Sequence, residues 1–551
     1  MGASLANDAI PVIDLFAGPG GLGEGFSSLR EGIARNGPAN FRICLSIEKD
    51  RAAWRTLWLR AFFRYFHAEG LRVPESYYDH LRQQMTVGEL RQRHPQAADA
   101  ADAEAWNIEL GAETPGPHAV KERITSALRD AGAGAGAGAA RTRKPWVLIG
   151  GPPCQAFSIV GRSRNKTKAG YTLKGDPRQR LYLEYLQVIA DHWPDVFVME
   201  NVKGMLSAQI EGKSVFSQIL EDLSDPQRVV GSRRVSDSRG YTVFSLTVST
   251  ESPVWDPAGV TSSLEPRDYV VHSERIGLPQ ARHRVILVGV RSDLGSTDVP
   301  RLPAVNSRTT VEQVIERLPR LRSGVSGQPD SAVEWQAILK EQLQARWVVQ
   351  TAAAEAREVI GLVRNTLSGL RLPRADRGNE FIECDAPTDY EPRWFADGRL
   401  GGIANHYTRS HMPSDLARYL FASCFTHVHQ RSPDLAEFPV QLLPDHANVA
   451  QAIVGQKFGD RFRVQARCRP ATTVVSHIAK DGHYYIHYDP TQCRSFTVRE
   501  AARVQTFPDN YLFVGNRTEQ YTQVGNAVPP LLAHKIAGIV HSVLDAVGAI
   551  R

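Results

Sequence analysis

The chain has 551 residues, of which 42% are hydrophobic and 23% are charged, with a formal net charge of +6. This composition excludes a disordered or fibrous chain and gives enough apolar material for about two to four domains. The small positive surplus permits a nucleic-acid partner without requiring one. Its six cysteines include no CxxC pair, so we expect neither a disulfide framework nor a metal site. No apolar run is long enough to cross a bilayer, so we expect no membrane partner and a cytoplasmic protein.

The N-terminal region predicts a strand, a glycine turn and a helix. The apolar run Ile10–Phe16 leads into Gly18-Pro19-Gly20-Gly21, which opens a helical pattern. A second predicted strand over residues 41–47 ends at Glu48. Glycines let a ligand approach the backbone at a helix N-terminus, and a carboxylate after the next strand can accept hydrogen bonds from ribose hydroxyls. Alone, the glycine turn is as compatible with a plain tight turn, but together with Glu48 it favours a nucleoside cofactor.

From about residue 51 to 140 the pattern is helical and ends in an Ala/Gly tract typical of a surface loop. A strand over residues 146–149 then leads to Gly151-Pro152-Pro153-Cys154. Ligands of open α/β sheets bind beyond the carboxyl ends of strands, and two prolines stiffen the approach. Cys154 is therefore a candidate nucleophile, whereas a small buried side chain is the ordinary interpretation of the other five cysteines.

Two further strands complete the predicted sheet. Residues 196–199 lead straight into Glu200-Asn201, and Gln280 to Arg284 lead into a strand over residues 284–290. Glu200 is a candidate acid if it lies near Cys154, and otherwise an ordinary surface glutamate. Alternation places Arg282 and Arg284 on one face, which suits carbonyl or phosphate binding, although a solvated basic strand start is the alternative. These apolar runs, separated by helices, predict a parallel sheet that is buried on both faces.

After residue 291 the regularity fades. A charged helix is predicted over residues 334–356, among irregular segments, and strand and helix patterns return only in the last eighty residues or so. We therefore expect a catalytic domain at residues 1–300 with a helical insertion at about 51–140. A separate, mostly irregular domain follows at 301–470, and a return segment at 471–551 completes the first domain.

In this order, six segments resemble the motifs of the DNA (cytosine-5) methyltransferase family, bacterial type. They are Asp14 to Gly21, Gly151 to Cys154, Glu200 to Val202, Gln280 to Arg284, Arg499 to Asp509 and Gln523 to Pro530. The resemblance implies an α/β fold with a Rossmann-like S-adenosylmethionine-dependent domain and a smaller target-recognition domain. It also implies methyl transfer from S-adenosylmethionine to carbon 5 of a cytosine that is flipped out of double-stranded DNA. The product would be S-adenosylhomocysteine.

The resemblance also assigns roles to individual residues. Cys154 would attack ring carbon 6, Glu200 would act on ring nitrogen 3, and Asn201 would hold the backbone of Pro153 and Cys154, while Arg282 and Arg284 would contact the cytosine and the loop. The implied cofactor residues are Phe16, Gly18, Gly20, Gly21, Glu48, Pro153, Leu181, Asn526 and Val528. The implied DNA-binding residues are Ser158, Arg162, Arg164, Arg467, Arg469, Thr472 and Thr473, the last four being equally compatible with structural packing.

One assignment is not made. Asn107 or Glu109 could contact the adenine amino group, but a solvated loop is the favoured interpretation of this segment, so the contact is left unassigned. One rival is an RNA methyltransferase, because Cys424-Phe425-Thr426 resembles a signature of the tRNA-modifying branch. The other is a catalytically silent DNA-binding regulator, against which the presence of both Cys154 and Glu200 argues. The family implies a monomer that is bound to DNA in the nucleoid, with a restriction endonuclease or defence system as its partner.

Overall fold

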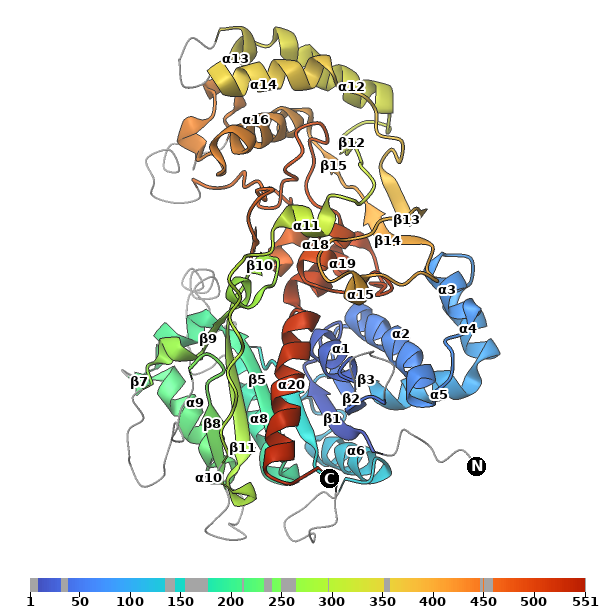
Figure 1. The fold of residues 1–551 in the computed structure, drawn as a ribbon, viewed down its shortest axis with the longest axis vertical. Helices are drawn as coiled ribbons and strands as arrows, with labels where there is room; N and C mark the ends of the chain where they lie inside the picture. The colour runs from blue at the N-terminus through green and yellow to red at the C-terminus, as the bar shows by residue number, and fades with distance from the viewer. Residues whose placement is uncertain are drawn as a thin grey trace.

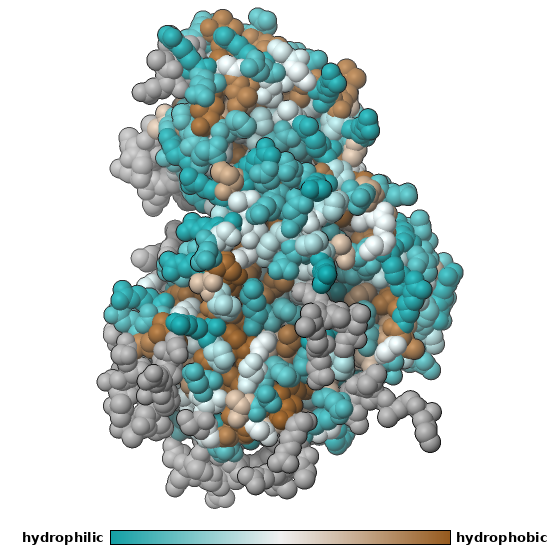
Figure 2. All heavy atoms as spheres, in the orientation of Figure 1, coloured by the Kyte–Doolittle hydropathy of each residue, from teal (hydrophilic) through white to brown (hydrophobic). Residues whose placement is uncertain are grey.

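The computed structural model describes residues 8–30, 38–133, 144–153, 177–210, 213–231, 240–248, 264–295, 297–350, 357–445, 449 and 459–550. Within them the chain forms two lobes (Figure 1). The lower lobe contains a large sheet with helices on both faces, and the upper lobe is built mostly of helices. Figure 2 shows hydrophilic side chains over most of this side of the molecule, whose outline is indented between the lobes.

The central sheet has the strand order β3-β2-β1-β4-β5-β11-β8, and β9 also pairs with β11. Neighbouring strands from β3 to β5 run parallel, whereas β11 is antiparallel to β5, β8 and β9. The strands are β1 (Ile10–Leu15), β2 (Phe41–Glu48), β3 (Ala105–Asn107), β4 (Val147–Gly150), β5 (Val196–Val202), β8 (Tyr241–Phe244), β9 (Val270–His272) and β11 (His283–Arg291). Because β1, β4 and the first four residues of β5 are buried throughout, their sequences lack polar alternation. The α/β fold expected from the sequence is confirmed. The expected all-parallel sheet is wrong for the strand over residues 284–290, because β11 runs antiparallel to each of its partners.

Each face of the sheet is covered by its own helices. On one face, α6 (Pro117–Asp130), α8 (Pro177–His192) and α9 (Val215–Ser224) contribute to one hydrophobic core, with α10 (Pro226–Val230) beside α8. On the other, α1 (Gly21–Ser27) and α20 (Pro530–Ala546) form a second core with the sheet. The last helix of the chain therefore completes the domain that the first strand begins (Figure 1).

A helical insertion lies between β2 and β3. It consists of α2 (Arg51–Ala68), α3 (Glu75–Leu81), α4 (Val87–Arg93) and α5 (Pro95–Glu104), which share one hydrophobic core. Asp50 begins α2 by accepting a hydrogen bond from the backbone N–H of Ala53 at 2.8 Å. Since β3 and α6 belong to the main layers, the inserted segment is shorter than the expected 51–140.

The upper lobe has a core made by α12 (Ala332–Glu341), α13 (Arg346–Val349), α14 (Arg357–Ser368) and α16 (Pro413–His429). The single charged helix expected over residues 334–356 is wrong, because Ala345 is extended (ψ 142°) and separates α12 from α13. Ile486 and Cys493 also pack in this core, beyond the boundary expected at residue 470.

Shorter elements join the lobes. They are α11 (Val311–Ile315), α15 (Pro392–Phe395), α18 (Val498–Val504), α19 (Arg517–Asn526) and the strand pairs β10 (Gln280–Ala281) with β16 (Ala471–Thr472), β12 (Gly324–Val325) with β15 (Ser410–His411), and β13 (Gly378–Glu383) with β14 (Gly402–Tyr407). A small hairpin, β6 (Gln209–Ile210) with β7 (Lys213–Ser214), precedes α9. The stretch Arg517–Ala546 is long and apolar enough to span a membrane, but 72% of its 18-residue apolar window is buried inside the protein, as in a core helix.

Candidate active site

The sheet brings the predicted motifs to one edge. In register, Leu15 of β1 pairs with Gly150 of β4, and Gly150 pairs with Met199 of β5. The residues that follow these positions, Phe16, Gly151 and Glu200, therefore leave neighbouring strands at the same level. The antiparallel strand β11 begins at this edge, where Arg284 pairs with Val202. Ligands of open α/β sheets bind at such an edge.

Glu200 is the acidic group at this edge. Its side chain is 14% exposed, and its Oε1 atom lies 2.8 Å from Nε of Arg284. A Cβ atom added to Gly151 would lie 3.2 Å from the other oxygen of Glu200, so a larger residue would crowd this carboxylate. Glu200 therefore faces the loop that follows β4, and Arg284 holds it from the side of β11.

Asn201 fixes the start of that loop. This buried side chain donates a hydrogen bond from Nδ2 to the carbonyl oxygen of Pro152 at 3.2 Å, and its Oδ1 accepts from the backbone N–H of Val202 at 2.8 Å. The expected hold of Asn201 on the backbone of Pro153 and Cys154 stays a prediction. Pro153 is half-buried next to it. Cys154, Ser158, Arg162 and Arg164 lie outside the described residues.

Arg282 is 2% exposed and donates a hydrogen bond from Nη1 to the carbonyl oxygen of Val474 at 2.8 Å. Burial and the positive charge of Arg284 lower the pKa of Arg282 to about 9, so its guanidinium still carries its charge near neutral pH. Of the two arginines, Arg284 contacts the candidate acid and Arg282 holds the segment that returns from the upper lobe.

The glycine turn after β1 approaches other segments closely. A Cβ atom on Gly21 would lie 2.1 Å from the carbonyl oxygen of Val528, and one on Gly20 would lie 2.7 Å from Leu57. Gly18 and Gly20 have positive φ angles of 58° and 95°, which glycine adopts without strain. Phe16 also has a positive φ, 57°. The turn is therefore shaped by its own packing as well as by any ligand.

Glu48 anchors the turn from the end of β2. Its carboxylate accepts hydrogen bonds from the backbone N–H groups of Gly18 at 2.8 Å and Asp50 at 2.7 Å. Burial raises the pKa of Glu48. Next to it, a cavity of about 590 Å³ opens at the ends of β2 and β3 and is lined by Lys49, Asp50, Arg51, Asn107, Ile108, Glu109, Thr114 and Pro115. Its position and polar lining fit a nucleoside.

Asn107 and Glu109, the two candidates for an adenine contact, differ in their surroundings. Asn107 donates from Nδ2 to the carbonyl oxygens of Glu48 at 2.8 Å and Lys49 at 3.1 Å. Glu109 is exposed and pairs with Lys49 at 2.9 Å. Among the other expected cofactor residues, Leu181 and Val528 are buried and Asn526 is exposed at the end of α19.

The expected DNA-binding residues between Arg467 and Thr473 differ in exposure and in their partners. Arg467 forms ion pairs with Glu312 and with Glu316, the latter at 2.7 Å. Arg469 is exposed. Thr473 donates to the carbonyl oxygen of Ala281 at 2.7 Å, and the Thr472 side chain hydrogen-bonds Gln465.

Sequence reasoning missed Gln280 and Gln505, which connect the motifs. Gln280 donates to Oε1 of Gln505 at 2.8 Å and accepts from the backbone N–H of Val474 at 2.8 Å. Gln505 donates in turn to the carbonyl oxygens of Val524 at 2.7 Å and Ala527 at 3.2 Å. Both side chains are fully buried, so each hydrogen bond fixes one segment against the next. The available signal was that each glutamine stands inside a segment already singled out, Gln280 to Arg284 and Arg499 to Asp509.

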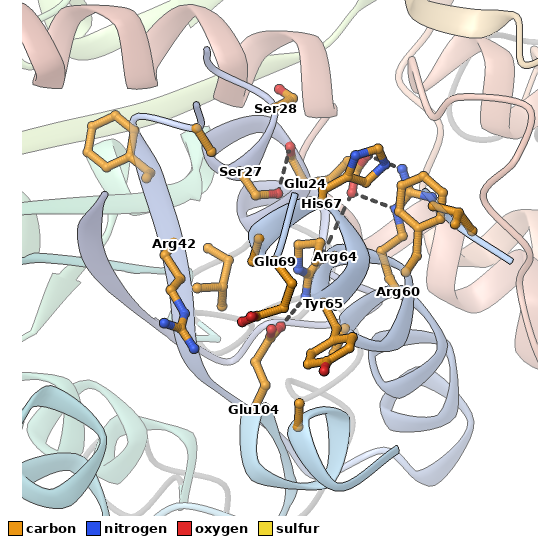
Figure 3. A pocket seen from close by; sticks show the side chains of 18 of the residues that line it. Glu24, Ser27, Ser28, Arg42, Arg60, Arg64, Tyr65, His67, Glu69 and Glu104 are labelled. Atoms are coloured by element: carbon orange, nitrogen blue, oxygen red, sulfur yellow. Dashed lines mark hydrogen bonds and ion pairs between the residues drawn. The ribbon is translucent and has the colours of Figure 1, made fainter. Parts of the chain in front are cut away.

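A second, larger cavity lies away from this edge. It has a volume of about 720 Å³ and includes Phe41 to Cys44, at the amino end of β2. Figure 3 shows Arg60 and Arg64 pointing toward Glu24 and Glu104 in its wall. Since catalysis in α/β sheets takes place at the opposite end of the strands, we assign no part of the reaction to it.

Comparison with known proteins agrees with this geometry. The family model described as C-5 cytosine-specific DNA methylase matches residues 141–227 and 265–541. The chain belongs to this family. Its enzyme class is DNA (cytosine-5-)-methyltransferase, and type II restriction–modification systems contain its relatives.

Three relatives illustrate how far the likeness to this methyltransferase extends. The type II methyltransferase M.Bpa9945I of Bacillus paralicheniformis is 32% identical over 97% of this chain and 99% of its own length. M.AgeI of Thalassovita gelatinovora is 26% identical over 95% of this chain and 97% of its own length. The DNA (cytosine-5-)-methyltransferase M.ApeKI of Aeropyrum pernix is 26% identical over 73% of this chain and 82% of its own length.

The tripeptide that suggested an RNA methyltransferase is part of the hydrophobic interior of this methyltransferase. Cys424, Phe425 and Thr426 are all buried in α16, and Cys424 contributes to the core of the upper lobe. Burial raises the pKa of Cys424 to about 12, so this thiol is protonated at neutral pH.

Proposed function

We propose that this enzyme transfers a methyl group from S-adenosylmethionine to carbon 5 of a flipped-out cytosine, through a covalent intermediate on Cys154. The observation that carries the proposal is the position of Glu200. It lies across from the loop that leads to Cys154, with Arg284 2.8 Å away, and Asn201 fixes Pro152 at the start of that loop. Nucleophile loop, acid and cation therefore come from three adjacent strands.

The reaction follows from these roles. The Cys154 thiolate adds to ring carbon 6, while Glu200 hydrogen-bonds or protonates ring nitrogen 3, so that the ring becomes an enamine. S-adenosylmethionine, when bound, would supply an electrophilic methyl group and leave as the thioether S-adenosylhomocysteine. Carbon 5 of the enamine forms the new carbon–carbon bond, then loses its proton, and the returning electron pair expels the thiolate. Arg284 orients Glu200, and Arg282 holds the return segment next to the ring.

The cofactor would lie along the edge from Phe16 to Asn107. At Gly18, Gly20 and Gly21 the cofactor could come close to the backbone, because no side chain stands in the way. Glu48 would accept hydrogen bonds from the ribose hydroxyls. The rest of the site would be formed by Leu181, Pro153, Asn526 and Val528. The cavity beside Glu48 and the polar groups around it support this placement. We leave the adenine amino contact open between Asn107, whose amide N–H groups bond backbone carbonyls, and Glu109.

Double-stranded DNA would bind between the lobes, with residues 301–470 as the target-recognition domain. Ser158, Arg162 and Arg164 would meet phosphates, and Arg469, Thr472 and Thr473 lie on the segment that joins the recognition lobe to Arg282. Arg467 would have to leave Glu312 and Glu316 to reach DNA. A monomer acting on the same site as a restriction endonuclease is the arrangement we propose.

The test is covalent trapping. In duplex DNA with 5-fluorocytosine at the target, carbon 5 carries a fluorine in place of the proton that must depart. Because the fluorine cannot leave, the thiolate is not expelled and the enzyme should remain attached to the DNA. We expect an adduct that survives denaturation and that Cys154→Ser abolishes. Bisulfite sequencing of DNA from cells that express the chain supplies the target sequence. Methylation by Cys154→Ser at a comparable rate, or labelling of tRNA but not of duplex DNA, would refute the proposal.

A further inference from the structure

A cluster of two histidines and a glutamate lies outside the groups assigned to the reaction. His272 ends β9 and His283 begins β11, and the two residues are direct partners in the antiparallel pair. Their ring centroids are 4.0 Å apart. Glu274, in the turn after β9, directs its carboxylate to both rings, with Oε1 3.0 Å from Nε2 of His283 and 3.7 Å from Nδ1 of His272.

These distances are those of a metal-ligand set. Zinc binds imidazole nitrogen and carboxylate oxygen at about 2.0–2.2 Å, so neighbouring ligand atoms in a tetrahedral site are about 3.4 Å apart. The two separations from Glu274, 3.0 and 3.7 Å, lie on either side of that value. All three ligand atoms lie within 4.8 Å of one another.

The second oxygen of Glu274 separates this interpretation from a simple hydrogen bond. Glu274 is 8% exposed, and within the described residues its Oε2 atom is buried without a hydrogen-bond partner. A hydrogen bond with His283 uses Oε1 alone and leaves the buried Oε2 unsatisfied, which is costly for a carboxylate. A cation bound by the three side chains would neutralise the charge that the two carboxylate oxygens share.

We propose that His272, Glu274 and His283 bind a divalent metal ion of the zinc class. The side chains of His272 and His283 are 27% and 34% exposed, so solvent can reach the fourth position. Binding requires neutral imidazoles, and the proton that His283 shares with Glu274 is released to solvent. Lys203 and Arg275 also act on His272, and their positive charges weaken the site, so we expect micromolar rather than tighter affinity.

The metal would be structural and would take no part in methyl transfer. It would tie the end of β9 to the first residue of β11, immediately before Arg284. Because side chains alternate along a strand, His283 points to the face opposite Arg282 and Arg284. The ion would thus steady the backbone that presents both arginines without touching the reacting groups.

The experiment measures binding to the full chain without DNA or cofactor, so its result is independent of the proposed reaction. Chelator-stripped protein is titrated with Zn²⁺ against a chromophoric chelator and with Co²⁺ by visible absorption. We expect a specific site that His272→Asn and Glu274→Gln each remove. His118→Asn is the matched control, because His118 lies 3.4 Å from Glu122 in an exposed helical pair to which the described residues add no third ligand.

Two results would overturn the proposal. One is an unchanged zinc stoichiometry in His272→Asn and Glu274→Gln, or an equal loss in His118→Asn. The other is measured on the wild-type chain. Its melting temperature is expected to rise when Zn²⁺ is added to the stripped protein. The absence of any rise at saturating Zn²⁺ would show that the cluster is only a hydrogen-bonded pair beside a second histidine.

Discussion

At the scale of single residues, the candidate site depends on side chains that fix one another. Glu200 is held by Arg284, Pro152 by Asn201, and the turn at Gly18 by Glu48. Each of these contacts joins two segments that are adjacent in the sheet but remote in the chain. The reacting groups are therefore positioned by hydrogen bonds that exist before DNA binds, which lowers the entropic cost of reaching the reactive arrangement.

Glu200→Gln tests the role of the acid. Glutamine keeps the shape of the side chain but cannot donate a proton as an acid, so we expect the turnover rate to fall by about 100-fold or more. Cofactor affinity should stay unchanged. Single-turnover methylation and isothermal titration with S-adenosylmethionine measure the two effects. Glu358→Gln, on the exposed first turn of α14, is the control, and equal losses in both variants would remove Glu200 from the mechanism.

At the scale of elements, the helical insertion is joined to the catalytic layers by a buried ion pair. Arg60 of α2 contacts Glu24 of α1 through two hydrogen bonds, at 2.5 and 2.8 Å, and both side chains are 7% exposed. Arg60 also donates to Asn510 at 3.1 Å. Although burial alone would raise it, Arg60 keeps the pKa of the Glu24 carboxyl below its usual range. The insertion therefore packs at once against α1, which follows the first motif turn, and against the residue that follows the motif from Arg499 to Asp509.

Replacing Arg60 alone should lower the free energy of unfolding more than replacing both members of the ion pair. Arg60→Met leaves the Glu24 carboxylate buried without its partner, and we expect a loss of about 3–5 kcal/mol in the free energy of unfolding. The double variant Arg60→Met with Glu24→Gln should recover part of that loss. Urea denaturation of the four proteins of this cycle gives the coupling energy. Additive losses would mean that the two side chains stabilise the fold separately.

At the scale of the whole molecule, the contact between the lobes contains buried, neutral histidines. Neutral His406 donates from Nε2 to the carbonyl oxygen of Pro319 and accepts at Nδ1 from the hydroxyl of Thr497, both at 2.9 Å, and His487 lies 3.5 Å from Glu500. Burial lowers the pKa of His406 and of His487 to about 4. These residues link β14 to the segment after α11 and to α18, and the carbonyl of His487 accepts a hydrogen bond from Ser423 of α16 in the recognition lobe.

The protein should lose stability in mild acid. In the unfolded chain these histidines titrate near 6.5, so above that pH they are neutral in both states and contribute no pH dependence. As the pH falls from about 6.5 toward 4, the unfolded state takes up protons that the folded state excludes, and the free energy of unfolding decreases by a few kcal/mol. Chemical denaturation at a series of pH values checks this. A flat profile between pH 7 and 5 would contradict the burial of neutral imidazoles.

The sequence by itself indicated five strands of the catalytic layers, β1, β2, β4, β5 and β11, and most of the candidate residues. The strands β3, β8 and β9 and the antiparallel direction of β11 emerged only from the structure. Apolar runs, the glycine turn from Gly18 to Gly21 and the strand-ending Glu48 and Glu200 are local signals, because each depends on residues adjacent in the chain. The tertiary structure alone decided the contacts between distant segments. The link from Gln280 to Gln505, the ion pairs of Arg467 and the cluster of His272, Glu274 and His283 arise from strand pairing and from lobe contacts. No local periodicity encodes such partners, because their free energy is gained only when separate elements pack together.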